Sequence, residues 1–283
     1  MPTLSKQQTK IIATAIKNQR PEIKATRVWL GLVAEFSIGR VDGNKINFTR
    51  SDYQQWRELL ISSCGFDPTT TELTGNRTEV SRITHQEKWA PESELKKQLS
   101  VTALGGDLIT TQGRCAVIPQ VDYRVNKAYL KPQDYNACLV VENFEAFVFI
   151  HQFNLPTLGH VLVLYRGHDL TARSVNEFLA DASDTPIIGF TDPDPAGLGI
   201  LNDWPWLSHA LIPKLTDLKN FTDIPSLHDR FISQLRKRPN LREECADKPQ
   251  AYRDYANWIL NAGFAGSQEW LCSHGVGLEV AGF

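Results

Sequence analysis

Three carboxylates in the second half of the chain have the residue type and spacing to hold a metal ion. Glu142 directly follows one apolar run, and Asp192 and Asp194 follow another about fifty residues later. The two aspartates are two residues apart and each is followed by proline, so both are expected to be extended and to point the same way. Converging carboxylates raise one another's pKa unless a cation lies between them. Because Mg²⁺ prefers oxygen ligands, we predict a Mg²⁺ or Mn²⁺ site at these three residues.

Each of these acids also has an ordinary structural interpretation. Asp194 precedes Pro-Ala-Gly and is a good helix N-cap, and Asp-Pro pairs form turns. Glu142 has the charge that stabilises a helix N-terminus. Glu145 is an alternative to Glu142 as the glutamate of the metal site, although Glu145 lies one turn into the expected helix. Capping explains any one acid more easily than the set of three.

The elements that must position these acids are strands and helices in alternation. Continuous β-rich apolar runs predict buried strands, and helical segments separate them. This alternation implies right-handed crossovers and a parallel sheet covered on both faces. Ligands bind such sheets at the carboxyl ends of the strands, where the three acids are expected. The predicted strands are 137–141, 160–165, 185–190 and 209–213, with helices over about 143–153, 171–182 and 195–204.

The first part of the chain has a different pattern. Ser5 is expected to cap a first helix, and a second helix covers roughly 25–36. The segment 39–49, with Asp-Gly-Asn near its centre, predicts a hairpin. Thr49 or Ser51 then caps a further helix. By pattern analogy, this region is winged-helix-like.

The chain is long enough for two domains, each with a core of its own. A polar, turn-rich stretch over 65–100 and strands within 107–119 precede the alternating region, so we place the boundary near residue 132. The predicted fold class is α/β: a Rossmann-like parallel sheet over 133–283, preceded by a winged-helix-like α+β region over 1–132.

Composition narrows the class of protein. Hydrophobic residues make up 42% and charged residues 22% of the 283 residues, as in globular proteins. No signal peptide and no apolar run near the ~18 residues of a membrane span is evident, so we expect a cytoplasmic protein. The five cysteines are scattered and lack a C-x-x-C pair, which indicates reduced thiols.

Charge is unevenly distributed although the net charge is only −2. Residues 6–27 contain six basic residues and one acid, and 236-RKRPNLR-242 contains four more basic residues. Solvated helix faces are the ordinary interpretation, and contact with a DNA backbone is the alternative. The candidate DNA contacts in the first cluster are Lys10, Lys17, Arg20, Lys24 and Arg27.

Three segments together resemble a Toprim domain, the catalytic module of topoisomerases, DnaG-type primases and several nucleases. The Toprim signature is a Glu after the first strand and Asp-x-Asp after the third, as Glu142, Asp192 and Asp194 stand here. The Asp-Pro-Ala-Gly continuation most resembles the branch of the topoisomerase VI A subunit, its meiotic relative, and the JetD (MksG) subunits of Wadjet-type condensin systems. The resemblance covers roughly residues 135–215, and its segments are 139-LVVENFEAF-147, 162-LVLYRGHD-169 and 187-IIGFTDPDPAGLGI-200.

This resemblance implies a Mg²⁺-dependent DNA endonuclease, the Toprim subunit of a Wadjet (MksBEFG-like) system that defends against plasmids. It also implies double-stranded DNA as substrate, condensin-like SMC and kleisin partners, and a homodimer. Glu142 would complete the coordination of the metal or act as general base. Arg166 and His168 would contact a phosphate, with a polar loop that pairs Arg166 with Asp169 as the alternative. The segment 267-SQEWL-271 is similar to a JetD segment and makes Glu269 a further candidate ligand, or a surface residue.

Three other functions stay open. A topoisomerase-like transesterase needs a nucleophilic tyrosine in the N-terminal region, and the nearest candidates, Tyr53 and Tyr123, do not match that motif, which favours hydrolysis. A degenerate Toprim domain could bind DNA without cutting it. An Asp-x-Asp phosphatase would place its aspartates after the first strand, whereas here the strand before Glu142 precedes them.

Overall fold

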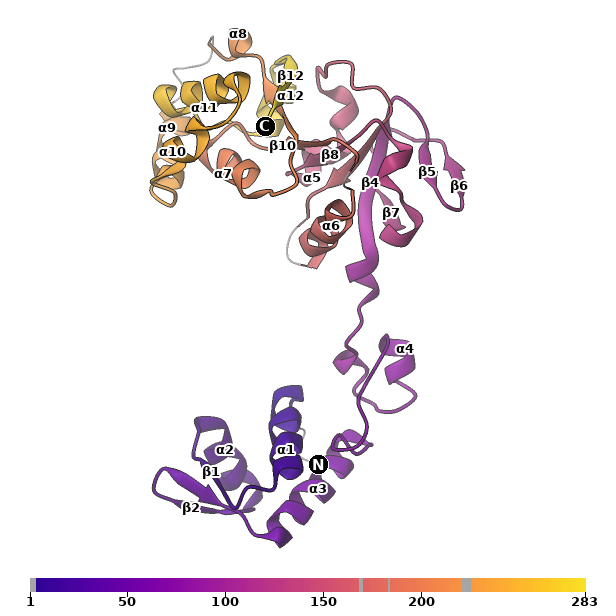
Figure 1. Cartoon of the computed structure of the whole chain (residues 1–283), viewed down its shortest axis with the longest axis vertical. Coiled ribbons are helices and arrows are strands. Elements are labelled where there is room, and N and C mark those ends of the chain that lie inside the picture. Colours follow the sequence, from indigo (N-terminus) through magenta and orange to yellow (C-terminus); the bar gives the residue numbers. More distant parts are fainter. Residues whose placement is uncertain (1–3, 168–169, 183, 220–224) are drawn as a thin grey trace. The chain divides into compact units, whose positions relative to one another are not determined.

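The chain folds into two compact units in the computed structural model, residues Met1–Glu94 and Leu95–Phe283 (Figure 1). The structure describes residues 4–167, 170–182, 184–219 and 225–283. Each unit buries its own apolar cluster, so each is described by itself.

The N-terminal unit packs three helices with a small antiparallel sheet of order β1-β3-β2. Trp56, Leu32 and Ile46 are fully buried at its centre, and the Trp29 ring meets that of Trp56 edge to face at 5.8 Å. Large aromatic rings give this small unit much of its apolar burial. Its main elements are α1 (Lys6–Asn18), β1 (Glu22–Lys24), α2 (Arg27–Phe36), β2 (Arg40–Asp42), β3 (Lys45–Asn47), α3 (Arg50–Cys64) and α4 (Arg77–Val80), with 3₁₀ turns at Glu87–Trp89 and Glu94–Lys97.

Local sequence signals in this unit are confirmed. Ser5 caps α1 with a capping box, and Thr49, rather than Ser51, caps α3 in the same way. The predicted hairpin forms with Asp42 paired to Lys45, and Gly43 supplies the positive φ that its two-residue turn needs.

The C-terminal unit contains a seven-stranded sheet of order β12-β11-β10-β8-β9-β4-β7. The four central strands, β11, β10, β8 and β9, are parallel, and all four were predicted from apolar runs. The α/β class is therefore confirmed, but the sheet is mixed, because β12, β4 and β7 pair antiparallel. The strands are β4 (Gln98–Leu104), β7 (Tyr123–Asn126), β8 (Ala137–Val141), β9 (Val161–Tyr165), β10 (Ile187–Phe190), β11 (His209–Pro213) and β12 (Leu278–Gly282), with a separate hairpin of β5 (Leu108–Thr110) and β6 (Gly113–Cys115).

The boundary expected near residue 132 lies instead between Glu94 and Leu95. The reason is β4, which pairs with β9 along Val101–Leu104 and buries Leu99, Val101 and Ala103 in the core of the second unit. A strand that pairs on both sides within a sheet belongs to that sheet's core, and the pairing of β4 with a strand sixty residues later leaves no local signal.

Helices flank the sheet of the C-terminal unit (Figure 1). Three of them, α5, α6 and α7, connect successive parallel strands, and α10 and α11 pack on α7. The helices are α5 (Phe144–Val148), α6 (Leu170–Ala180), α7 (Pro195–Asp203), α8 (Leu215–Leu218), α9 (Pro225–Leu235), α10 (Leu241–Ala246), α11 (Gln250–Ala262) and α12 (Gln268–Ser273), with 3₁₀ turns at Lys127–Tyr129, Pro132–Asp134 and Ile150–Gln152.

Among the helices of the described residues, none combines the length and the apolar character needed to cross a membrane.

Candidate functional site

The three predicted acids meet at the carboxyl edge of the parallel strands. Because β8 and β10 are neighbours in register, with Val141 opposite Phe190, Glu142 emerges beside the loop that carries both aspartates. The backbone N–H of Glu142 donates to Phe190 O at 3.0 Å. In return, the backbone N–H of Asp192 donates to Glu142 Oε2 at 3.1 Å. The sheet therefore brings together residues that are fifty positions apart.

Asp192 is held by donors on three different elements. Its Oδ1 accepts from Asn143 Nδ2 and from the backbone N–H of Gln268, both at 2.8 Å. Its Oδ2 accepts from Arg230 Nη2 at 2.9 Å. The side chain is almost fully buried, so these hydrogen bonds fix its direction.

Asp194 combines a cap with a second contact to the same arginine. Its Oδ1 accepts from the backbone N–H of Gly197 at 2.7 Å, which confirms the predicted N-cap of α7. Its Oδ2 accepts from Arg230 Nη2 at 2.8 Å and from Gln234 Nε2 at 2.7 Å. Asp194 therefore caps α7 with Oδ1, while its Oδ2 remains on the side that faces Arg230 and a candidate cation site.

The electrostatics of the site disfavour negative charge. Burial, together with the charge of Asp192, raises the pKa of Glu142 to about 7. Burial and, to a smaller extent, the charge of Asp194 raise the pKa of Asp192 to about 6, although the hydrogen bond from Gln268 and the charge of Arg230 act in the opposite direction. Clustered, buried carboxylates of this kind are stabilised by a cation.

The carboxylate oxygens of the two aspartates are suitable ligands for a hard divalent cation. Both Oδ2 atoms lie within hydrogen-bond distance of one nitrogen, Arg230 Nη2, so they already converge on a single positive charge. Carboxylate oxygens are the ligands that Mg²⁺ and Mn²⁺ prefer. As the side chains stand, no group of three His, Cys, Asp or Glu in the described part of the chain is arranged to hold a metal ion. Arg230 occupies the side of the aspartates that a metal would share.

Four residues of this site were missed at the level of sequence: Asn143, Arg230, Gln234 and Gln268. Gln268 is fully buried, and its Oε1 accepts from the backbone N–H of Asn143 at 2.9 Å while its Nε2 donates to Phe190 O at 3.1 Å. It lies in the segment 267–271 that was singled out for its glutamate. The sequence resemblance therefore pointed to the correct segment, but it was assigned to Glu269 and not to its neighbour Gln268.

The other predicted residues of the C-terminal unit have different outcomes. Arg166 follows β9, its backbone N–H donates to Val141 O at 2.8 Å, and its charge lowers the pKa of Glu142. His168 lies outside the described residues, as does Asp169. Glu269 lines a cavity of about 320 Å³ together with Glu145, and its described interactions include none with the three acids. Glu145 is exposed on α5, so Glu142 is the glutamate at the aspartates.

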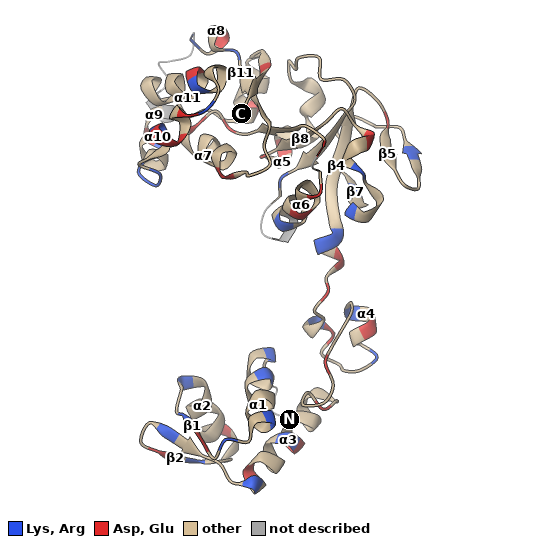
Figure 2. Cartoon of the chain, in the orientation of Figure 1, with Lys and Arg blue, Asp and Glu red and all other residues tan. Residues whose placement is uncertain are grey.

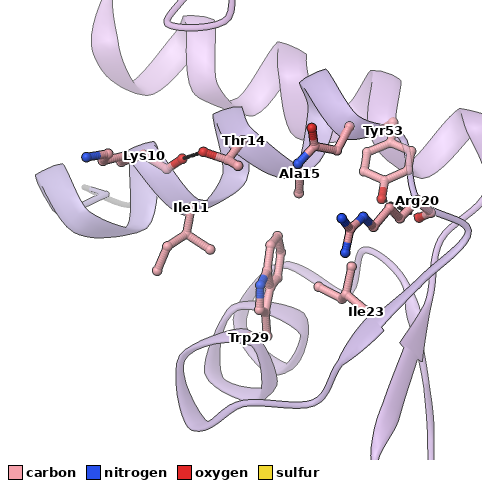
Figure 3. A pocket seen from close by; sticks show the side chains of 9 residues that line it. Lys10, Ile11, Thr14, Ala15, Arg20, Ile23, Trp29 and Tyr53 are labelled. Carbon is pink, nitrogen blue, oxygen red and sulfur yellow. Dashed lines mark hydrogen bonds between the residues drawn. The ribbon is translucent and has the colours of Figure 1, made fainter.

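The predicted DNA contacts of the N-terminal unit are all exposed, and Lys and Arg recur along α1 (Figure 2). Two of them, Lys10 and Arg20, line an open cavity of about 380 Å³ between α1, β1 and α2. Figure 3 shows Arg20, Ile23 and Trp29 gathered around this cavity. The second basic cluster is different, because Arg238 pairs with Asp203 of α7 and Glu244 of α10 at 2.8 and 2.6 Å and joins these two helices.

Neither candidate tyrosine is poised as a nucleophile. Tyr53 is buried, its hydroxyl donates to Arg20 O at 2.6 Å (Figure 3), and burial and the charge of Asp52 raise its pKa. The Tyr123 hydroxyl donates to Ala116 O and accepts from the backbone N–H of Ile118. A nucleophile needs an exposed oxygen beside a base, and both hydroxyls are engaged with backbone.

Comparison with known proteins identifies a family for the C-terminal unit. Among curated proteins, none matches the chain. Residues 96–280 match the model of a family described as a domain of unknown function, DUF7281. The match begins and ends within the second compact unit and contains all of the residues around Asp192. The chain therefore belongs to the DUF7281 family.

Proposed function

We propose that the protein is a metal-dependent DNA endonuclease that hydrolyses phosphodiester bonds with Mg²⁺ or Mn²⁺. One observation carries this proposal: Glu142 and the pair Asp192 and Asp194 emerge side by side from neighbouring parallel strands. The order of these acids along the chain, Glu after the first parallel strand and Asp-x-Asp after the third, supports a Toprim-like site. The parallel strands β8, β9, β10 and β11 follow one another in sequence, which supports the same interpretation.

The roles of the acids follow from their environments. Asp192 and Asp194 would hold the metal through their Oδ2 atoms, because their Oδ1 atoms bond Asn143, Gln268 and Gly197. When bound, a divalent ion supplies positive charge to the phosphoryl oxygens and to the leaving oxygen. Glu142 would complete the coordination or accept the proton of the attacking water.

Arg166 is our candidate for a phosphate contact. It follows β9, the strand next to β8, and its charge acts on Glu142. An arginine at this edge can donate two hydrogen bonds to a phosphate. His168 retains its predicted role on sequence grounds alone.

The N-terminal unit would hold the DNA backbone. It places exposed basic side chains on α1, on β1 and at the start of α2, and its β2–β3 hairpin supports a winged-helix-like interpretation. Lysine and arginine at such positions neutralise phosphates without reading sequence. The proposed contacts are Lys10, Lys17, Arg20, Lys24 and Arg27.

The biological setting is proposed from the resemblance to JetD (MksG) proteins. In that setting the chain is the nuclease subunit of a Wadjet-like defence system that acts on plasmids. Its partners would be condensin-like SMC and kleisin subunits and a second copy of itself.

The test is plasmid nicking by the purified full chain with Mg²⁺, with Mn²⁺, or with chelator. We expect wild-type protein to nick only with metal, and Asp192→Ala to lower the rate by about 100-fold or more, since it removes a ligand. Glu145→Gln is the matched control, because it removes an exposed acid from the first turn after Glu142, and its rate should be unchanged. Equal nicking by wild type and Asp192→Ala would exclude these acids as the metal site.

A second candidate function is DNA binding without cleavage. The observation that favours it is the ion pair of Arg230 with both aspartates, since a degenerate site can retain its acids as a structural network. This alternative predicts DNA affinity that is indifferent to chelator and to Asp192→Ala, with no nicking under any condition. A topoisomerase-like transesterase has less support, because Tyr53 is buried and bonded to backbone.

A further inference from the structure

One side chain of α9 neutralises both aspartates of the site. Arg230 Nη2 lies 2.9 Å from Asp192 Oδ2 and 2.8 Å from Asp194 Oδ2, so a single nitrogen bridges the two carboxylates. Gln234, one turn later on the same helix, donates its Nε2 to the same oxygen of Asp194 at 2.7 Å. Both Oδ2 atoms are therefore occupied by one face of α9.

The remaining oxygens of the pair already accept hydrogen bonds from the fold. Asp192 Oδ1 accepts from Asn143 and from the backbone N–H of Gln268, and Asp194 Oδ1 caps α7 at Gly197. Releasing any of these donors would leave a polar group unpaired inside the fold, which is costly. The two Oδ2 atoms are therefore the oxygens that the pair presents to a cation on the same side, and these are the atoms that Arg230 holds.

The two sides of this ion pair differ in their access to water. The Arg230 side chain is 43% exposed, whereas the side chains of Asp192 and Asp194 are 9% and 1% exposed. A guanidinium at the surface regains hydration when it leaves, while the buried carboxylates cannot follow it. One guanidinium also carries one positive charge for two carboxylates, and a divalent ion carries two.

One buried polar atom of α9 beside the aspartates has no hydrogen-bond partner among the described residues. This atom is Gln234 Oε1, and the amide nitrogen of the same side chain bonds Asp194. Buried acceptors normally have a partner, so moving this face of α9 away would remove an unfavourable feature.

We propose that Arg230 is an internal counter-cation of the site, which competes with a divalent metal ion for the Oδ2 atoms of Asp192 and Asp194. Loading of the metal then requires that Arg230 leave the pair, and α9 controls metal affinity. The inference deepens the proposed function by assigning regulation to the same site, and it rests on that function only for the nature of the ligand.

The test is direct binding of Mn²⁺ to the full chain, followed by the electron paramagnetic resonance signal of free Mn²⁺ at constant pH and ionic strength. We expect Arg230→Gln to bind Mn²⁺ at least fivefold more tightly than wild type. Arg236→Gln is the matched control, because it removes the same charge from an exposed position just beyond α9, and its affinity should stay within twofold of wild type. Asp192→Asn should abolish the binding.

A second measurement keeps the test valid if Arg230→Gln is unstable. Without metal, this variant removes the ion pairs of both carboxylates that the structure describes, so its melting temperature should fall below that of wild type, and Mn²⁺ should raise it by more than it raises that of wild type. Arg230→Lys retains one positive charge on a different head group, so its Mn²⁺ affinity should lie between that of wild type and that of Arg230→Gln.

The outcomes separate the two proposals. Equal or weaker Mn²⁺ affinity in Arg230→Gln and Arg230→Lys, with binding still abolished by Asp192→Asn, would overturn the competition and leave the metal site intact. If no variant and no wild-type protein binds Mn²⁺, both the metal site and the role of Arg230 are wrong.

Discussion

At the scale of single residues, the site depends on one side chain that carries no charge. Gln268 is completely buried, and its amide joins the backbone of Asn143 to that of Phe190 while its own backbone N–H holds Asp192. A buried amide of this kind stabilises the fold mainly because its removal leaves its partners unpaired. It thus ties α12 to the loops after β8 and β10.

We expect Gln268→Ala to lower the free energy of unfolding of the C-terminal unit by about 2 to 4 kcal/mol, because the backbone N–H of Asn143 loses its partner, Phe190 O loses one of its two donors, and a fully buried side chain is removed. Urea denaturation followed by circular dichroism measures the change. Gln250→Ala is the matched control, since Gln250 is also the first residue of its helix but is exposed, and its effect should stay within about 0.5 kcal/mol. Equal effects of the two variants would contradict the assigned network.

At the scale of elements, the junction between β10 and α7 sets the distance between the two aspartates. Asp194 caps α7 at Gly197, and the helix then approaches the chain it has just left. A Cβ at Gly197 would lie 2.1 Å from Asp192 O and 2.9 Å from Thr191 Oγ1. The glycine is therefore required for close approach, although its position in a helix would otherwise favour alanine.

Gly197→Ala should lower the free energy of unfolding of the C-terminal unit by about 2 kcal/mol or more, because the added methyl group must push α7 away from Asp192. The same substitution at Gly31, an exposed position of α2 with nothing within 4 Å of an added Cβ, should stabilise the N-terminal unit by up to about 1 kcal/mol. If thermal or urea unfolding shows that Gly197→Ala is destabilising and Gly31→Ala is stabilising, then the close approach of the backbone, and not helix propensity, determines the effect of substitution at Gly197. A stabilising Gly197→Ala would refute it.

At the scale of the whole molecule, the chain separates its two proposed tasks between two compact units. Residues 1–94 contain 13 Lys and Arg against 11 Asp and Glu, whereas residues 95–283 contain 17 against 21. The basic excess thus lies in the unit proposed to hold DNA, and the acidic excess lies in the unit that carries the carboxylates. An acidic unit that acts on a polyanion needs a cation at the point of contact.

The fragment 95–283 should fold by itself, because it contains β4 and therefore the complete seven-stranded sheet. The fragment 133–283, which begins at the boundary expected from sequence, lacks β4 and β7 and exposes the edge of β9. We expect cooperative urea unfolding of the first fragment and aggregation or a non-cooperative transition of the second. Cooperative unfolding of the shorter fragment would show that β4 is dispensable.

Much of the parallel core and its acids could be predicted from sequence, because those signals are local. Four buried strands are continuous apolar runs, the N-caps Ser5, Thr49 and Asp194 precede helical patterns, and the acids stand at strand ends. The register between β8 and β10 then follows from the topology of a parallel sheet, which explains why Glu142 and Asp192 were expected together.

The partners of those acids were decided only by the tertiary structure. Arg230 lies 38 residues beyond Asp192, and Gln268 lies 76 residues beyond it, on helices whose sequences show no sign of the contact. The antiparallel strands β4 and β12 were likewise not recognised as members of the sheet, because their pairing with the outer parallel strands β9 and β11 depends on which distant chain segment reaches those strands. Sequence by itself determined where negative charge would gather, since strand ends and proline spacing are local properties. The fold decided what neutralises that charge, because a salt bridge forms between groups that only the packed chain brings within 3 Å.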